Sequence, residues 1–163
     1  MKILIRKGIK KDLPQVLSLI KELAKFENAE HEVTISLDDL KKDGFGKNPY
    51  FQFIVAIVND QIIGLSFYFI RYSTWKGKYL FLEDFIVTEK FRSQGVGSKL
   101  FEETIRICKS ESMNGMFWQV LEWNKAAIKF YKKYNSNISS DWLNGKLTKN
   151  DIEKINFINE IKN

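Results

Sequence analysis

The chain has 163 residues, of which 44% are hydrophobic and 14% aromatic, so it suits one globular domain (residues 1–163) and is too apolar for a disordered protein. No apolar run is long enough to cross a membrane, and the N-terminal apolar stretch is too short for a signal peptide. A single cysteine and a single histidine leave no material for a disulfide or a metal cluster. These features predict a cytoplasmic protein without a metal. The net charge of +6 comes from lysines spread along the chain, so we expect no nucleic-acid partner, although a phosphorylated cofactor would suit this charge.

The first half of the chain predicts one strand, two helices and an antiparallel meander. Asp12 is a candidate N-cap for the first helix, and Ser36 and Asp39 have capping-box spacing at the start of the second. Asn59-Asp60 suits a tight hairpin turn. The expected elements are strand 2–6, a helix with the apolar face Leu13, Val16, Leu17, Ile20, Leu23 and Ala24, helix 36–44, strands 51–58 and 61–72, turn 75–78 and strand 79–87.

The second half predicts strands that alternate with helices. The expected elements are a helix after Gly97 with the face Leu100, Phe101, Thr104, Ile105 and Cys108, strand 116–121, helix 124–134, a weak strand 142–147, and a last helix capped by Thr148 that carries Ile152, Ile155, Ile158 and Ile161. This order of elements predicts a mixed α/β fold with an antiparallel part and a later parallel crossover. The loop that holds Gly95 and Gly97 joins the two halves.

That loop, residues 92–98 (Arg-Ser-Gln-Gly-Val-Gly-Ser), lies between a β-prone segment and a helix. Several backbone N–H groups converge in such a turn and the helix dipole adds positive character, so the loop suits a phosphate or pyrophosphate. Gly95 and Gly97 would let the backbone approach such a ligand without a Cβ in the way. The alternative is a plain turn from strand to helix that binds nothing.

Three clusters of reactive side chains flank this loop. Glu83-Asp84 lies in the preceding strand, where one carboxylate is expected to face the interior or a cleft unless the strand is an edge or bulged strand with both in water. Glu122-Trp123-Asn124 stands between a strand end and a helix, which suits ligand contact, unless Asn124 only caps its helix. The phenol of Tyr131 would reach the loop, unless Phe130 and Tyr131 form a buried aromatic pair.

The order of these motifs resembles the GNAT family of N-acetyltransferases: a strand with Glu-Asp, then Arg-x-x-Gly-x-Gly at a helix start, then a strand, Asn, and a helix with Tyr. Segments 19–27, 43–46, 75–78, 82–85 and 122–124 further resemble its diamine (spermidine/spermine) and thialysine N-acetyltransferase branch. The resemblance extends to about Asn135. It implies the acyl-CoA N-acyltransferase fold, a central and mostly antiparallel sheet with two splayed parallel strands and flanking helices.

The resemblance also implies the reaction, in which acetyl-CoA gives its acetyl group to a primary amine without a metal or a covalent enzyme intermediate. Glu83 would take the proton of the amine, directly or through water, and Tyr131 would protonate the departing thiolate, because the pKa of a phenol lies near that of a thiol. Strand amides near Phe85 would polarise the thioester carbonyl. The cofactor-binding residues implied are Phe85, Ile86, Val87, Arg92, Ser93, Gln94, Gly95, Val96, Gly97, Ser98, Asn124, Lys125, Ala126 and Ala127.

The amine is expected on a second side of the site, where the matching residues are Phe26, Glu27, Trp75, Glu83, Asp84 and Trp142. Ser73 stands where the polyamine branch carries Asp, which favours a lysine-like amine such as thialysine over a long polycation. Enzymes of this kind are usually homodimers. Two alternatives stay open: an acetyltransferase of protein or peptide amines, and a CoA-binding module without catalysis.

Overall fold

The computed structural model describes residues 2–155, and the chain divides into two compact units, Met1–Gln119 and Val120–Asn163. The first unit contains the sheet and the helices that cover it. The second contains two short helices and the connecting chain. The mixed α/β class is confirmed, while the single domain expected over residues 1–163 stays a prediction.

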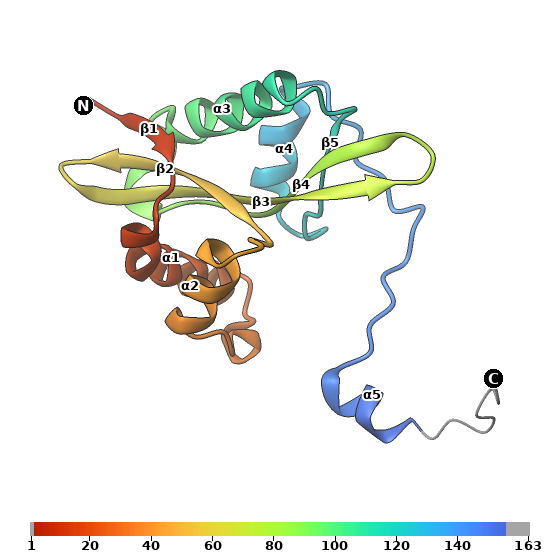
Figure 1. Ribbon diagram of the computed structural model, residues 1–163. Helices are drawn as coiled ribbons and strands as arrows, with labels where there is room; N and C mark the ends of the chain where they lie inside the picture. The colour runs from red at the N-terminus through yellow and green to blue at the C-terminus, as the bar shows by residue number, and fades with distance from the viewer. Residues whose placement is uncertain (1, 156–163) are drawn as a thin grey trace. The chain divides into compact units, whose positions relative to one another are not determined.

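The sheet of the first unit has five strands in the order in which they occur in the chain. They are β1 (Leu4–Lys7), β2 (Gln52–Val58), β3 (Gln61–Ser73), β4 (Gly77–Val87) and β5 (Met116–Trp118). Neighbours from β1 to β4 are antiparallel, and β5 joins β4 in parallel after the crossover through α3 (Val96–Ser110), as predicted (Figure 1). The parallel ladder spans Leu80 to Leu82 of β4, so β4 continues for five residues beyond it.

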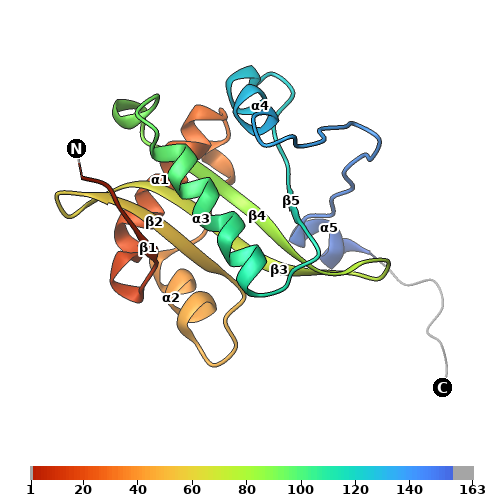
Figure 2. The same cartoon turned by 90° about the horizontal axis from the view of Figure 1, so that it is seen from above.

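Helices cover both faces of this sheet. The helices α1 (Leu13–Phe26) and α2 (Leu37–Phe45) lie on one face, and α3 lies on the other (Figures 1 and 2). A short 3-10 turn precedes each of these helices: η1 (Lys10–Asp12), η2 (Glu30–Glu32) and η3 (Glu89–Phe91). The capping box of Ser36 and Asp39 is confirmed, and Asn59 and Asp60 both have positive φ, as a tight hairpin turn requires.

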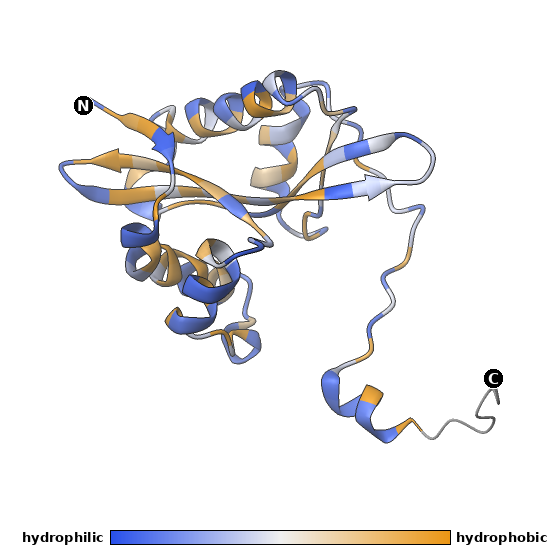
Figure 3. Ribbon diagram, in the orientation of Figure 1, coloured by the Kyte–Doolittle hydropathy of each residue, from blue (hydrophilic) through white to orange (hydrophobic). Residues whose placement is uncertain are grey.

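The main core lies between α1 and the sheet. Leu13 and Val16 of α1 pack with Val55, Leu65 and Ile86 of the strands, and apolar colour runs along the central strands in Figure 3. On the α3 face, the hydroxyls of Ser66 and Thr104 form a fully buried hydrogen bond of 2.8 Å. Burying a hydroxyl is costly unless it is hydrogen-bonded, so this pair fixes how α3 sits on β3.

Asp12 is the N-cap residue of α1, as predicted, but its side chain makes no capping hydrogen bond. Its carboxylate instead accepts hydrogen bonds from Arg6 at 2.7 and 2.8 Å and from the backbone N–H of Ile9 at 2.8 Å. The bidentate guanidinium is the stronger partner, and its hydrogen bonds hold the pKa of Asp12 below the usual value. The residue therefore ties β1 to the entrance of α1.

The second unit differs most from prediction. Helix α4 (Lys125–Lys132) is shorter than expected, β5 ends at Trp118, and residues 142–147 form no strand. Thr148 caps α5 (Lys149–Lys154) through a capping box with Asp151, as predicted. Ile158 and Ile161, expected on this helix, lie outside the described residues. Within residues 2–155 no helix combines the length and apolar character needed to span a membrane.

Candidate active site

The loop before α3 has the backbone of an anion-binding turn. Ser93 has φ 60° and Gly95 has φ 80°, and Gly95 is the N-cap of α3 without a side-chain capping bond. A Cβ placed on Gly95 would meet no atom within 4 Å, so the space in front of this residue is open. First-turn N–H groups and open space together fit a phosphate.

The polar side chains of this loop brace the loop itself. The Nε of Arg92 donates to the carbonyl of Val87 at 2.9 Å, and the Nε2 of Gln94 donates to the carbonyl of Lys90 at 2.9 Å. Both acceptors lie at the junction of β4 and η3. The loop is thus held against the end of the strand, and its backbone amides are the groups that remain suited to a ligand.

β4 carries a β-bulge at Glu83. Asp84 lies opposite Phe67 of β3 and Leu82 lies opposite Tyr68, so Glu83 is the extra residue in the ladder. Phe67 and Tyr68 point to opposite faces, and cross-strand neighbours share a face. Asp84 therefore lies with Phe67 on the α1 face. In a strand without a bulge, Leu82 would lie on this face too.

Three carboxylates lie close to one another here: Asp84 on the α1 face, Glu83 beside it at the bulge, and Glu27 at the end of α1. Burial, followed by the charges of Glu83 and Glu27, raises the pKa of Asp84 to about 6. Burial also raises the pKa of Glu83 and of Glu27, even though the Glu83 side chain keeps an exposed surface. Glu27 follows directly after α1, whose last residue is Phe26. Asp84 is thus the inward carboxylate that was expected. The alternative of a bulged strand is also correct in part, because Glu83 at the bulge is exposed.

In the strand segment that follows Asp84, the side chains of Phe85 and Ile86 point to opposite faces of the sheet. Phe85 packs edge-on against Phe101 of α3, with ring centroids 5.6 Å apart, and Ile86 belongs to the core on the α1 side. These residues lie beyond the ladder with β5. Glu83, Asp84 and the segment expected to carry the thioester are therefore consecutive on one strand.

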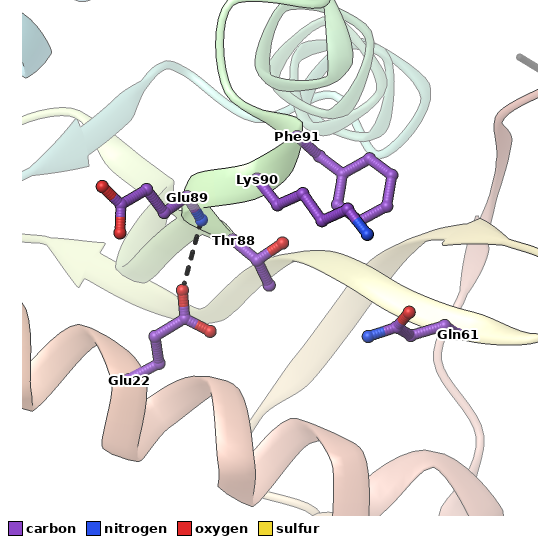
Figure 4. Close-up of a pocket in the computed structure, with 6 residues that line it drawn as sticks. All are labelled: Glu22, Gln61, Thr88, Glu89, Lys90 and Phe91. Carbon is purple, nitrogen blue, oxygen red and sulfur yellow. Dashed lines mark hydrogen bonds between the residues drawn. The ribbon is translucent and has the colours of Figure 1, made fainter.

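An open pocket of about 520 Å³ lies where α1 faces η3 (Figure 4). The Oε1 of Glu22 accepts a hydrogen bond of 3.4 Å from the N–H of Glu89. One turn further along α1, the guanidinium carbon of Arg92 lies 5.1 Å from the centre of the Phe26 ring. Glu22 was not among the site residues predicted from sequence, although its four-residue spacing from Phe26 puts both on one face of α1. The pocket is lined by Glu22, Gln61, Thr88, Glu89, Lys90 and Phe91.

The first unit does not bring Trp75 to the carboxylates. Trp75 is 83% exposed in the turn between β3 and β4. Gly77 and Asp84 are seven positions apart on β4, which corresponds to roughly 23 Å of extended strand. Of the expected amine-side residues in this unit, Phe26, Glu27, Glu83 and Asp84 lie near one another, and Trp75 stands apart.

In the second unit, Asn124 caps α4. Its Oδ1 accepts the N–H of Ala127 at 3.1 Å, so the capping alternative is correct for this oxygen. Lys125, Ala126 and Ala127 form the first turn of this helix. Tyr131 is buried, and its ring centroid lies 5.3 Å from that of Phe130. This arrangement agrees with the alternative of an aromatic pair. Trp142 is exposed.

Comparison with known proteins identifies the class of enzyme. The model of the acetyltransferase (GNAT) family matches residues 15–135, most of the chain. The chain belongs to this family, and it is an enzyme, an N-acetyltransferase. It is 35% identical to the thialysine N-epsilon-acetyltransferase of Mus musculus over 136 residues, 78% of this chain and 80% of the mouse protein. It is 39% identical to the spermidine/spermine N(1)-acetyltransferase-like protein 1 of Homo sapiens over 127 residues, 74% of this chain and 18% of that longer protein.

Solved structures support the same fold. An integron cassette protein from V. cholerae superposes with a TM-score of 0.77 at 20% identity, covering 94% of this chain and 97% of that one. An aminoglycoside acetyltransferase from an uncultured soil metagenomic sample gives 0.75 at 18% identity, covering 90% and 95%. At such identities the likeness establishes the fold alone.

Among residues 2–155 there is no group of three or more His, Cys, Asp or Glu side chains arranged for a metal ion.

Proposed function

We propose that this enzyme transfers the acetyl group of acetyl-CoA to the primary amine of a small polyamine, diamine or lysine-like molecule such as thialysine, by direct attack of the amine. The observation that carries this proposal is the cluster of Glu27, Glu83 and Asp84, in which the charges of the two glutamates act on Asp84 and the segment 85–87 follows Asp84 directly. A cationic amine is the substrate that such a cluster attracts. The relatives named above, which carry thialysine and spermidine/spermine in their names, support the same substrate class.

The carboxylates answer the main chemical difficulty of the reaction. An alkyl ammonium has a pKa near 10, so at neutral pH almost all of the substrate is protonated and cannot attack. Glu83 is proposed as the base, directly or through a water molecule. Its raised pKa makes it a stronger base than an exposed glutamate, and its exposed surface leaves it open to an incoming amine. Asp84 and Glu27 would hold the ammonium through charge.

The donor side is built from backbone. Acetyl-CoA supplies the activated acetyl thioester, and the loop residues Ser93, Gln94, Gly95, Val96, Gly97 and Ser98 would hold its pyrophosphate. The open space at Gly95 and the uncapped first turn of α3 fit that group. Phe85, Ile86 and Val87 would hold the pantetheine arm with their strand backbone. Asn124 and the first turn of α4 are proposed to complete the site, with Tyr131 as the acid that protonates the leaving thiolate.

We further propose a short amine as the preferred acceptor. Ser73 offers no carboxylate near Trp75, and this turn lies far along β4 from Asp84. A short, lysine-like amine held at Asp84 would not need contacts there. A long polyamine would lose the second anionic contact that holds its far end.

A homodimer is also proposed. The C-terminal segment of the second unit exposes large apolar side chains, which a second copy would cover. These are Trp142, Leu143, Leu147, Ile152 and Ile155. Light scattering during size-exclusion chromatography checks the mass, and a monomer at micromolar concentration would contradict this proposal.

The decisive experiment measures thiol release from acetyl-CoA with thialysine, lysine, putrescine and spermidine as acceptors, alongside lysine-containing peptides. We expect thialysine to give the highest kcat/KM. Faster turnover of peptides would favour a protein acetyltransferase, and tight CoA binding without turnover of any amine would favour a binding module.

A further inference from the structure

The end of α1 contacts the chain that leads into the donor loop at two points. Glu22 accepts the N–H of Glu89, and the ring of Phe26 lies under the guanidinium of Arg92. The two residues are four positions apart and therefore project from one side of the helix. Figure 4 shows the first of these contacts, with Glu22 on α1 below the backbone of Glu89.

Arg92 joins the loop to both the strand and the helix. Its Nε is bonded to the carbonyl of Val87, the last residue of β4, while its guanidinium covers Phe26. Ser93, the next residue, begins the loop in a left-handed conformation. The position of this guanidinium therefore depends on how the loop is folded.

Phe26 is the last residue of α1, and Glu27 follows it. The N–H of Glu27 bonds to the carbonyl of Leu23 at 2.9 Å, so the helix end fixes the backbone direction of this residue. The charge of Glu27 reaches Asp84 across the face of the sheet. A shift of Phe26 would move Glu27, and with it the field at the proposed amine site.

We propose that Arg92 and Phe26 form a clamp, a positioning pair that couples the donor loop to the amine-binding carboxylates. The inference rests on the proposed function, since the loop holds CoA and the carboxylates hold the amine there. Arg92 is already held by the carbonyl of Val87, and an anion bound by the loop amides would restrict the loop, and with it Arg92, further; through Phe26 this would restrict the end of α1, where Glu27 stands. Coupling between two binding sites is reciprocal, so CoA tightens amine binding and the amine tightens CoA binding.

The clamp is tested by titration calorimetry of thialysine and of spermidine, each with and without saturating CoA. For an exposed cation–π contact we expect CoA to tighten amine binding roughly two- to five-fold. Phe26→Leu should bring this factor close to one, and Phe26→Tyr, which keeps an aromatic ring, should retain it. Arg92→Lys should lower the factor, and combining it with Phe26→Leu should add nothing further, because both act through one contact.

Phe45→Leu is the matched control. Phe45 is the last residue of α2 and 37% exposed, compared with 39% for Phe26 at the end of α1, but it contacts Phe53 instead of the loop. This variant should keep the wild-type factor.

The outcomes separate the two proposals. A wild-type protein that binds both ligands without coupling, or a Phe26→Leu variant that retains the full factor, overturns the clamp alone. A wild-type protein that binds neither CoA nor either amine overturns the proposed function and the clamp with it.

Discussion

The two sides of the candidate site are made from different parts of the chain. The donor side is backbone: a loop with two left-handed residues at the start of α3, in which the side chains of Arg92 and Gln94 are hydrogen-bonded to β4 and η3. The amine side is made of side chains, three carboxylates that a bulge and a helix end bring together. A backbone site depends on conformations that few residues adopt, whereas a side-chain site depends on charge and burial.

This difference predicts that substitutions on the two sides will change different kinetic constants. Changes to the carboxylates should act on the amine and on pH dependence. Changes to the loop should act on acetyl-CoA, with the amine constants following only through the clamp.

The largest effect is expected for Glu83→Gln, which removes the proposed base. At pH 7 the kcat/KM for the amine should fall about 100-fold, the lower end of what general bases usually supply. The loss should shrink at higher pH, where more of the amine is unprotonated, so the pH–rate profile shifts toward higher pH. Steady-state kinetics from pH 6 to 10 measure this, with the exposed Glu30→Gln as control. A 100-fold loss that is constant across this range would remove Glu83 from the proton path.

Tyr131→Phe should lower kcat about ten-fold or more while the KM for acetyl-CoA changes little, since only the proton for the leaving thiolate is lost. Tyr134→Phe, three residues further along the chain, is the control and should change kcat less than two-fold. Thermal unfolding of both variants separates a lost proton donor from a damaged fold. An unchanged kcat in Tyr131→Phe would end its proposed role.

Asp84→Asn should weaken amine binding and stabilise the protein at the same time. The pKa of Asp84 is raised to about 6 in the folded chain, mainly by burial. The folded state thus binds more protons than the unfolded state between pH about 4 and 6, and the free energy of unfolding falls as pH rises through that window. Asparagine removes this cost, which is about 1 to 2 kcal/mol once solvent screening is allowed for.

Thermal unfolding checks this prediction. At pH 8 the Tm of Asp84→Asn should exceed that of the parent by about 2 to 6 °C, whereas at pH 5 the difference should shrink. Asp141→Asn in the exposed C-terminal segment is the control at both pH values. An equal change of Tm at pH 5 and pH 8 would mean that titration of Asp84 is not the cause.

The smallest effect is expected on the donor side. Gly95 has φ 80°, and an L side chain in that conformation costs roughly 1 kcal/mol or more. Gly95→Ala should therefore raise the KM for acetyl-CoA about five-fold, and Gly95→Asn, which tolerates this conformation, should raise it less. Gly145→Ala, at an exposed glycine without positive φ, is the control. Equal KM values for Gly95→Ala and the parent would place the donor phosphate elsewhere.

The same contrast explains how much was predictable. The loop before α3, the capping box of Ser36 and the hairpin at Asn59-Asp60 were all found from sequence, because each depends on a residue type with a rare local geometry. The family followed from the order of the motifs, and it is confirmed.

Long-range partners account for the misses. Asp12 suits an N-cap locally, but Arg6, six residues away, binds it more strongly. The pairing of β4 with β3, and not the composition of β4, sets the bulge at Glu83. The amine side could therefore be named residue by residue from the family resemblance, while the bulge at Glu83, the effect of Glu27 on Asp84 and the contact of Phe26 with Arg92 required the folded chain.

The bulge in β4 has a further consequence for how this strand tolerates change. One extra residue reverses the inside–outside phase of the strand, so residues before and after Glu83 follow opposite alternation. A deletion of Glu83 would remove one carboxylate and leave Leu82 and Asp84 as direct neighbours, opposite Tyr68 and Phe67 as before. The strand would then be regular, and the side chains on either side of the deletion would keep the faces that they have now. The position of Glu83 could therefore be lost without disturbing the pairing of β4 with β3, and what would be lost with it is the carboxylate proposed as the base.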